Sequence, residues 1–408
     1  MRVLFLHQNF PGQFVHLSRG MAAAGHTVKA LAISPRLAIN GVSIIRYTPQ
    51  RSSTRGIHPW AIDFESKAIR AEACARKMAE LDAAGFTPDL VIGHPGWGET
   101  WMVKDVWPSA RLLCLQEFYY GADLNFDLEF SIPQLEGAFR FRAKNAALLP
   151  GLDTMDWGMS PTEWQRVQFP ERYRSRITAA FEGIDTDIVC PRDVASVELG
   201  SPPVTFERGM ELVTFINRAL EPYRGYHTFM RALPRLLALR PNAHVVIVGG
   251  DENGYGAPPK TGTWRDRFLD EVRKNIDLTR VHFVGKVQYG ALLDLIRISS
   301  CHVYLTYPFV LSWSMLEAMA LGAIVVGSRT GPVEDVITDG ENGLLVNFFD
   351  FDALAQRVAD VLETPAQFQP LRERARQTIV ERFALSRCLP RQIALAEAVA
   401  RGQLPPDV

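Results

Sequence analysis

The segment from Cys301 to Val346 carries a charged side chain where a buried helix would normally be apolar. Glu317 interrupts the apolar run SMLEAMALG, and Ser312 is placed to cap the start of that helix. Apolar runs on both sides of the helix predict a strand–loop–helix–strand order. That order is typical of a parallel α/β sheet, in which ligands lie at the carboxyl ends of the strands. We therefore expect the Glu317 carboxylate to contact a ligand.

Two arginines lie six residues apart at another predicted strand-to-helix junction. Arg218 follows a predicted strand over 212–216, and Arg224 precedes a predicted helix over 225–239. Two guanidinium groups at such a junction can hold a diphosphate through bidentate hydrogen bonds. The alternative is a pair of surface arginines in a loop.

The first half of the chain offers weaker candidates at similar positions. Gly12, in a Pro-Gly turn after the first predicted strand, can let the backbone approach a phosphate or an acceptor. His94 ends a predicted strand, with the alternative that it only caps the strand end. Glu99 can orient His94 or contact an acceptor, or it is simply a first-turn acid of a helix. Glu117 and Tyr119 follow another strand, where an aromatic ring can stack on a sugar.

Alternating strands and helices predict the elements that must position these residues. The pattern breaks at Cys190–Gly209, which we interpret as an interdomain linker. The fold class is therefore α/β, with two Rossmann-like domains facing each other across a cleft that can enclose a substrate. The expected divisions are residues 1–195 for an acceptor-binding domain, 205–385 for a nucleotide-sugar domain, and 386–408 for a helix returning to the first domain.

Composition narrows the classes of protein that the chain can represent. With 408 residues, 47% apolar and 22% charged, it is typical of a soluble globular protein of two domains. A net charge of −1 gives no global attraction to nucleic acid. Five dispersed cysteines without a CxxC pair indicate reduced thiols rather than disulfides or a zinc site. The apolar N-terminal run is too short for a signal peptide, and no run is long enough to span a bilayer.

Several ordered motifs of the second half resemble the retaining family-4 glycosyltransferases of the GT-B fold. They are Arg218 with Arg224-Gly225, VHFVGKV at 281–287, LEAMALGAIVVGS, and GPVEDVITDGENGLLV. The resemblance covers nearly the whole second domain, and Arg224 stands where the family has a lysine. It implies that Arg218 and Arg224 hold the donor diphosphate and that Glu317 binds the ribose hydroxyls. It further implies that Lys286 and Val287 contact the donor near its base. The Gly12 loop and the amides of Val310, Leu311 and Ser312 are expected to contact the donor as well. His94 is expected to have a catalytic role beside the reacting sugar.

One position departs from the family pattern. The family carries two glutamates separated by seven residues, and counting back from Glu317 places Phe309 at the first of them. That glutamate normally contacts hydroxyls of the transferred sugar. The departure predicts a different way of holding the donor sugar, and it leaves open a modified or inactive relative.

Two charged patterns have less direct interpretations. Asp185-Thr-Asp187 spells a DxD pattern that binds metal in a different glycosyltransferase fold, but here we interpret it as a turn. The resemblance implies no metal, because cationic side chains and helix dipoles stabilise the leaving diphosphate. The arginines at 166, 172, 174 and 176 are either a solvated surface or a patch that docks on a lipid acceptor.

The resemblance implies a retaining hexosyltransferase that moves a sugar from a UDP-sugar or GDP-sugar to an acceptor hydroxyl. The donor is a substrate, and no cofactor is expected. The acceptor is a glycan, a lipid-linked sugar or a small molecule, and nucleic acid is not expected as a partner. We expect a cytoplasmic protein, with peripheral contact at the inner face of the membrane left open. The alternatives are a sugar-nucleotide epimerase of related architecture and a non-catalytic nucleotide-sugar-binding partner.

Overall fold

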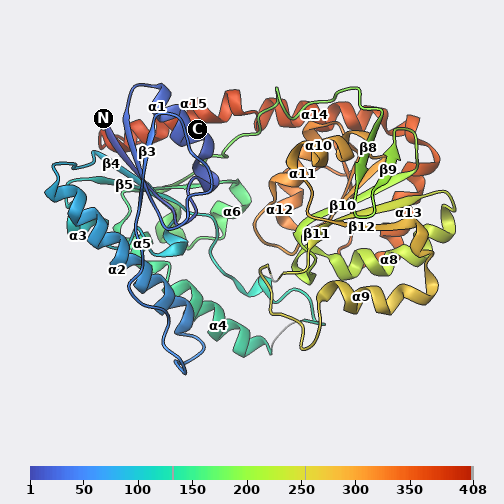
Figure 1. Ribbon diagram of the computed structural model, residues 1–408, viewed down its shortest axis with the longest axis horizontal. Helices are drawn as coiled ribbons and strands as arrows, with labels where there is room; N and C mark the ends of the chain where they lie inside the picture. The colour runs from blue at the N-terminus through green and yellow to red at the C-terminus, as the bar shows by residue number, and fades with distance from the viewer. Residues whose placement is uncertain (131–132, 253, 406–408) are drawn as a thin grey trace. The chain divides into compact units, whose positions relative to one another are not determined.

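The chain folds into two compact α/β units. The structure is a computed structural model that describes residues 1–130, 133–252 and 254–405. Unit 1 consists of Met1–Gly183 together with Leu385–Val408, and unit 2 consists of Ile184–Ala384 (Figure 1). We describe each unit by itself.

In the described part of unit 1, seven parallel strands form one sheet in the order β3-β2-β1-β4-β5-β6-β7. Its strands are β1 (Arg2–Leu6), β2 (Thr27–Ala32), β3 (Val42–Arg46), β4 (Leu90–Gly93), β5 (Arg111–Leu115), β6 (Trp157–Ser160) and β7 (Ile177–Ala179). Its α-helices are α1 (Val15–Ala23), α2 (Ile62–Ala83), α3 (Val103–Val106), α4 (Gln134–Ala146), α5 (Leu149–Thr154), α6 (Glu163–Val167), α7 (Glu171–Arg174) and α15 (Leu385–Ala400). Short 3-10 turns lie at η1 (Gly12–Phe14), η2 (Pro95–Trp97) and η3 (Ala122–Leu124).

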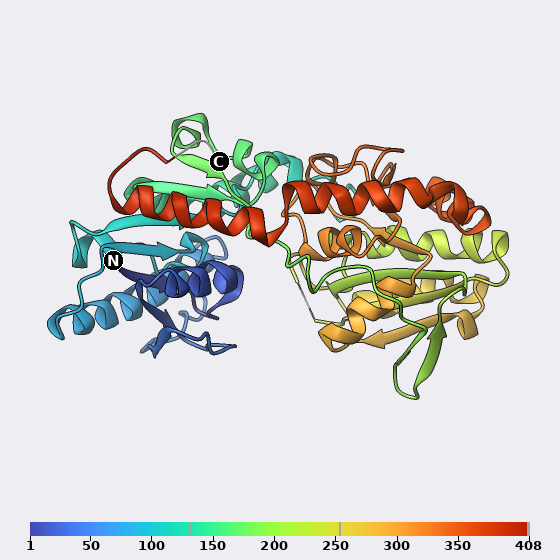
Figure 2. The same cartoon turned by 90° about the horizontal axis from the view of Figure 1, so that it is seen from above.

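Strand β1 buries side chains on both faces of this sheet. Val3 and Phe5 belong to a core that includes residues of α1 and α15, and Leu4 and Leu6 belong to a core that includes residues of α2, α3 and α5. Both faces are covered because successive side chains of a strand point to opposite sides. Helix α15, the last helix of the chain, lies beside α1 (Figures 1 and 2).

In the described part of unit 2, six parallel strands form a sheet in the order β12-β11-β10-β13-β14-β15, beside an antiparallel pair β8-β9. Its strands are β8 (Ser196–Leu199), β9 (Val204–Glu207), β10 (Leu212–Ala219), β11 (His244–Gly250), β12 (Val281–Gly285), β13 (Cys301–Tyr304), β14 (Val325–Ser328) and β15 (Leu344–Val346). Its α-helices are α8 (Tyr226–Leu239), α9 (Trp264–Val272), α10 (Tyr289–Ile298), α11 (Trp313–Ala320), α12 (Gly331–Glu334), α13 (Phe351–Glu363) and α14 (Gln369–Arg382). The 3-10 turns are η4 (Pro222–Arg224), η5 (Arg273–Asn275), η6 (Leu278–Arg280) and η7 (Pro365–Phe368).

Strand β10 shows how the core of unit 2 is divided. Phe215 stacks on Phe229 of α8 with ring centroids 4.4 Å apart. The adjacent Thr214 lies 3.0 Å from both Ser299 Oγ and His302 Nδ1, so its buried hydroxyl is paired. Helix α10 also contacts β10, and α8 packs on α13, so helices cover both faces of the sheet, as the α/β pattern of the sequence predicts.

Each sheet has one point where the strand order reverses direction. In unit 1 it lies between β1 and β4, and in unit 2 between β10 and β13. Connections leave such neighbouring strands toward opposite faces of the sheet, which opens a crevice at the carboxyl ends. The loops after these four strands are therefore where ligand contacts are expected.

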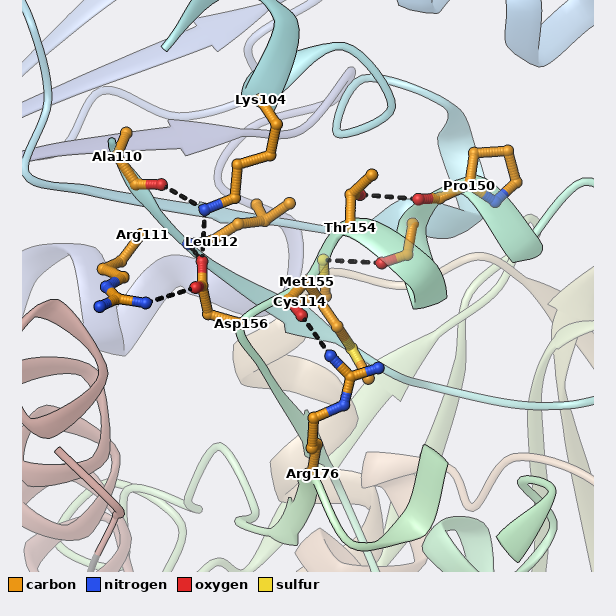
Figure 3. Close-up of polar contacts among 11 residues, drawn as sticks. Lys104, Ala110, Arg111, Leu112, Cys114, Pro150, Thr154, Met155, Asp156 and Arg176 are labelled. Carbon is orange, nitrogen blue, oxygen red and sulfur yellow. Dashed lines mark hydrogen bonds and ion pairs between the residues drawn. The ribbon is translucent and has the colours of Figure 1, made fainter. Parts of the chain in front are cut away.

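An aspartate fixes the opposite edge of the unit 1 sheet, where β5 and β6 begin. Asp156 accepts hydrogen bonds from Lys104 Nζ at 2.6 Å, Arg111 Nη1 at 2.7 Å and the Leu112 amide at 2.8 Å. Figure 3 shows Lys104 and Arg111 both pointing at this carboxylate. Burial alone would raise the pKa of Asp156, but these donors hold it below its usual value. The network is structural, because it ties the start of one strand to its neighbour.

The structure corrects several local predictions. Cys190–Gly209 is not a bare linker, because β8 and β9 form a hairpin there within unit 2. The apolar and β-branched residues at 154–159 predict a strand from Thr154, but Thr154 ends helix α5 and β6 begins only at Trp157. Strands β3 and β7 were not predicted; both are short edge strands with mixed burial. In the described part of the chain, no helix is both long and apolar enough to cross a membrane.

Candidate functional site

Arg218 is the exposed cation at the switch point of unit 2. It lies near the carboxyl end of β10, and no hydrogen bond to its side chain is seen within the described residues. Lys286, just after β12, pairs with Glu252 at 2.5 Å. Lys286 and, more weakly, Arg218 hold the pKa of Glu252 below its usual value. At the carboxyl edge of β10–β12, Arg218 is therefore exposed, Lys286 pairs with a carboxylate that an anionic ligand could displace, and the neighbouring Asp251 pairs with Arg265.

Arg224 occupies a different environment, although it lies only six residues away. Its side chain is buried, and Nη1 donates to Thr306 Oγ1 at 2.8 Å, the Val310 carbonyl at 3.1 Å and Tyr304 Oη at 3.3 Å. The guanidinium also lies 5.2 Å from the centre of the Tyr255 ring. Arg224 thus joins the loop after β10 to the loop after β13, and it is more restrained than Arg218.

Glu317 lies on α11 and is held by a tyrosine. Tyr289 Oη, at the start of α10, donates to Glu317 Oε1 at 2.6 Å. Burial raises the pKa of Glu317, and the hydrogen bond from Tyr289 offsets part of that rise. No hydrogen bond to Oε2 is seen in the described part of the chain. Oε1 of Glu317 therefore already accepts a hydrogen bond from Tyr289, and Oε2 can accept one from a ligand hydroxyl.

The loop before α11 presents fewer amides than the sequence suggests. Ser312 is the N-cap of α11, as predicted, and its Oγ accepts from the Ser314 amide at 3.3 Å. The Ser312 amide, however, donates to Tyr304 Oη at 2.9 Å. Among the described residues, the amides of Val310 and Leu311 have no acceptor, so these two are the donors left for an oxygen ligand.

Phe309 belongs to an aromatic cluster around Arg224. It is buried, with ring centroids 4.9 Å from Tyr255 and 5.7 Å from Tyr223. The loop that carries Tyr255 is tied down by Glu221, which accepts from the amides of Tyr255 and Gly256 at 3.0 and 3.1 Å. Phe309 thus places an apolar ring beside the buried Arg224 guanidinium.

In unit 1, a histidine, a glutamate and a glutamine meet near the switch point. His94 Nδ1 accepts from the Gly96 amide at 3.0 Å, which places the ring proton on Nε2. Nε2 lies 3.3 Å from Glu117 Oε2, and Gln13 Nε2 donates to Glu117 Oε1 at 3.0 Å. Burial alone would raise the pKa of Glu117, but the bonds from His94 and Gln13 hold it below its usual value. The cluster is an ionised carboxylate with an imidazole donor at its side.

His7 adds a second imidazole after β1. It is buried, and its ring lies 6.3 Å from the His94 ring. Burial, with a further contribution from His94, lowers the pKa of His7 to about 4. Gly12 packs against this ring: a Cβ at Gly12 would lie 2.6 Å from His7 Cε1, and its φ of +51° favours glycine. The Gly12 backbone thus packs closely against His7, and its approach to a phosphate or an acceptor stays a prediction.

Glu99 and Tyr119 are placed differently from Glu117. Glu99 is fully enclosed, and Tyr47 Oη donates to its Oε1 at 2.7 Å. Burial raises the pKa of Glu99. Because Glu99 does not reach the surface, direct contact with an acceptor would require unit 1 to open. Tyr119 is half-buried, with its ring 5.7 Å from Phe169.

The two remaining charged patterns are used locally. Asp185 Oδ1 accepts from the amides of Asp187 and Ile188 at 3.2 and 3.3 Å, which makes the DxD segment a turn. In the basic cluster, Arg166 pairs with Glu163, while Arg174 and Arg176 donate to backbone carbonyls of unit 1. These three arginines stabilise their own unit.

Sequence reasoning missed His7, Tyr289 and Tyr255 as members of these clusters. A signal existed for His7, which directly follows the first strand, and for Tyr289, which lies two residues after the end of the 281–287 motif. Nothing local marked Tyr255, because its position depends on Glu221, 34 residues away.

Comparisons with known proteins identify the family of the two units. Residues 24–189 match the model for the glycosyl transferase family 4 group, and residues 202–379 match the model for glycosyl transferases group 1. The chain is 23% identical to a glycogen synthase of Mycobacterium tuberculosis over 100% of this chain and 97% of that protein. It is 27% identical to D-inositol 3-phosphate glycosyltransferase 2 of Catenulispora acidiphila over 86% and 85%.

Solved structures show the same fold. A sucrose-phosphate synthase of Thermosynechococcus elongatus superposes with a TM-score of 0.73 at 17% identity, covering 99% of this chain and 100% of that one. Anabaena Alr3699/HepE, solved in complex with UDP-glucose, gives 0.68 at 14% identity, covering 98% and 100%. With one family model on each unit and this fold throughout, the chain belongs to the glycosyltransferases of the GT-B fold.

Proposed function

We propose that this protein is a retaining hexosyltransferase that uses a UDP-sugar or a GDP-sugar, without a metal ion. The observation that carries the proposal is that unit 2 has both an exposed Arg218 and a Glu317 carboxylate with only one of its oxygens bonded by Tyr289. A guanidinium suits a diphosphate, and a carboxylate suits ribose hydroxyls. The relative solved with UDP-glucose supports a nucleotide sugar as the donor.

In the proposed reaction, the chain acts mainly through charge and position. Arg218 offsets the charge that builds on the departing diphosphate, and Lys286 adds to the positive field once a ligand replaces Glu252. Arg224 keeps the loops after β10 and β13 in place. The acceptor hydroxyl attacks the anomeric carbon on the face that the diphosphate leaves, and its proton passes to a phosphate oxygen of the donor.

Unit 1 is the proposed acceptor side. Glu117, ionised and oriented by His94 and Gln13, can accept a hydrogen bond from a hydroxyl of the acceptor or of the transferred sugar. We propose a glycan, lipid-linked or small-molecule acceptor. The three bonded arginines of the basic cluster give no support to membrane docking. A cytoplasmic location is part of the proposal, supported by five free thiols in the described residues.

The test is nucleotide binding followed by turnover. A thermal-shift screen of UDP, GDP, ADP and their sugars would identify the donor. Arg218→Ala should then weaken binding of that donor at least tenfold, because a charge-assisted hydrogen bond is lost. Lys274→Ala, another exposed cation of unit 2, is the matched control. Unchanged donor affinity in Arg218→Ala would reject the assignment of the site.

One observation favours a second candidate, a non-catalytic nucleotide-sugar binder. Phe309 fills the position of the family's sugar-contacting glutamate with a buried ring. This candidate predicts donor binding without donor consumption for any acceptor pool. A changed sugar nucleotide in the absence of acceptor would instead indicate an epimerase. Product analysis by NMR separates the three outcomes and reports the anomeric configuration.

A further inference from the structure

Unit 2 has a pocket on the edge of its sheet opposite to Arg218. The pocket has a volume of about 850 Å³ and is lined by residues that immediately precede β13 and β14, including Ser300 and Gly322. Arg218 lies near the carboxyl end of β10, and the strands are parallel. The two places are therefore separated by the length of the strands and do not form one site.

Arginines dominate the lining of this pocket. Five of them contribute, and the described lining contains one acid, Glu373. The five are Arg192, Arg208, Arg297, Arg372 and Arg376. Two are paired with carboxylates outside the lining: Arg297 with Asp294 at 2.7 Å, and Arg208 with Asp193 at 3.7 Å. The other three have no carboxylate partner within the described residues.

Arg372 and Arg376 are held in place by backbone carbonyls instead of by acids. Arg372 donates to Gly322 O at 2.9 Å and Ser300 O at 3.1 Å, and Arg376 donates to Ala320 O at 2.6 Å. Carbonyl dipoles orient a guanidinium without neutralising its charge. Burial, together with the charge of Arg208, lowers the pKa of Arg372. The pocket thus holds partly desolvated cations in fixed positions, an arrangement that an anion would stabilise.

The remainder of the lining is partly apolar, and it also includes the polar residues Ser299, Ser300, Gln369 and Gln377. Ile298 and Leu321 are buried residues that contribute to the wall, and Pro365 and Ala366 form part of it at the start of η7. Ligand pockets of similar volume combine such apolar walls with a few fixed polar groups. The pocket therefore suits a small organic molecule that carries a phosphate, rather than a chloride ion or a water cluster.

We propose that this arginine pocket is a binding site for a phosphate-bearing small molecule, separate from the donor site and independent of turnover. Guanidinium groups bind phosphate oxygens through paired hydrogen bonds. Residues 191–209 and 365–380 both contribute, and they adjoin the two places where the chain passes between the units. Occupancy of the pocket would link these two segments of unit 2 through one ligand.

The test is calorimetric titration of the full chain with inorganic pyrophosphate at constant ionic strength. Arg192→Gln and Arg372→Gln should each weaken binding about tenfold. Glu373→Gln removes the acid of the lining and should strengthen binding about threefold or more, an effect that a merely structural residue would not produce. Arg374→Gln, an exposed arginine on the same helix α14 outside the lining, should leave the affinity unchanged.

Two further arms separate this pocket from the donor site and identify the ligand source. In Arg218→Ala, pyrophosphate binding that still responds to Glu373→Gln supports the proposal, and complete loss of binding overturns it. Glycerol 3-phosphate binding more tightly than inorganic phosphate indicates an organic ligand, and equal affinity indicates free phosphate. Arg372→Gln loses two hydrogen bonds to carbonyl groups, which can prevent it from folding. In that case the affinities of Arg192→Gln and Glu373→Gln for pyrophosphate test the proposal. Wild-type affinity in both of these variants would reject the proposal.

Discussion

Glu317→Gln should weaken nucleotide binding by a predictable amount, because only one carboxylate oxygen is available. Tyr289 already donates to Oε1 at 2.6 Å, which leaves Oε2 for a ribose hydroxyl. A hydrogen bond to a charged group contributes about 1.5–3 kcal/mol, and an amide retains only part of it. A neutral hydrogen bond contributes about 0.5–1.5 kcal/mol, so the net loss is about 1–1.5 kcal/mol and the dissociation constant of the nucleoside diphosphate should rise roughly 5- to 15-fold. If both oxygens were open, the loss would be larger.

The assay is a double-mutant cycle in which the second change is made in the ligand. Wild type and Glu317→Gln are titrated with the nucleoside diphosphate found by thermal shift and with its 2′-deoxy and 3′-deoxy forms. Removing a ligand hydroxyl that contacts Glu317 should weaken binding to the wild type. The same removal should weaken binding to the variant much less. Tyr289→Phe is the control, because it keeps the carboxylate while removing its phenol partner. That variant should retain nucleotide affinity.

Two results would refute this reasoning. The first is an unchanged dissociation constant in Glu317→Gln. The second is a loss of affinity on removal of each ribose hydroxyl that is the same in wild type and in the variant. Such additive losses mean that Glu317 and the ribose do not interact. In either case the buried carboxylate would be a partner of Tyr289 alone, and the ribose contact would have to be sought elsewhere in unit 2.

Three further predictions concern the supporting structure and are checked by chemical denaturation. Gly12→Ala should lower the free energy of unfolding by about 1–3 kcal/mol more than Gly25→Ala. Both glycines have a positive φ, but only a Cβ at Gly12 would clash with His7. Equal losses of stability in the two variants would contradict this packing. Asp156→Asn should cost about 1–3 kcal/mol at pH 7. The pKa of Asp156 is lower in the folded than in the unfolded protein, so the extra stability of the wild type should be complete above the unfolded-state pKa. That extra stability should disappear as the pH falls through the folded-state pKa. A constant difference in unfolding free energy down to pH 2 would contradict this. Phe309→Leu should cost about 1 kcal/mol through lost ring contacts, and full retention of stability would argue against the aromatic cluster.

Local pattern was sufficient to predict several elements that position candidate residues in both units. The apolar run after Arg2 predicts β1, and Ser312 predicts the start of α11, because strand periodicity and helix capping depend on residues close in sequence. The same holds for the strand-to-helix junction that carries Arg218. The Asp185 turn also follows from a side chain bonding its own neighbours.

Contacts between distant residues decided what each candidate side chain can do. Arg218 and Arg224 look equivalent in the sequence, but Arg224 is buried because loops 86 residues apart converge on it. Glu99 and Glu117 look equally suited to an acceptor, but the phenol of Tyr47 closes over Glu99.

The sequence by itself therefore determined the α/β class, the two repeats of the sheet pattern, and the residue types at the carboxyl ends of the strands, because periodicity and capping are local. The tertiary structure alone decided which of those residues remain available to a ligand and where the arginine pocket forms. The physical reason is that burial, pairing and desolvation depend on neighbours that come from other parts of the chain.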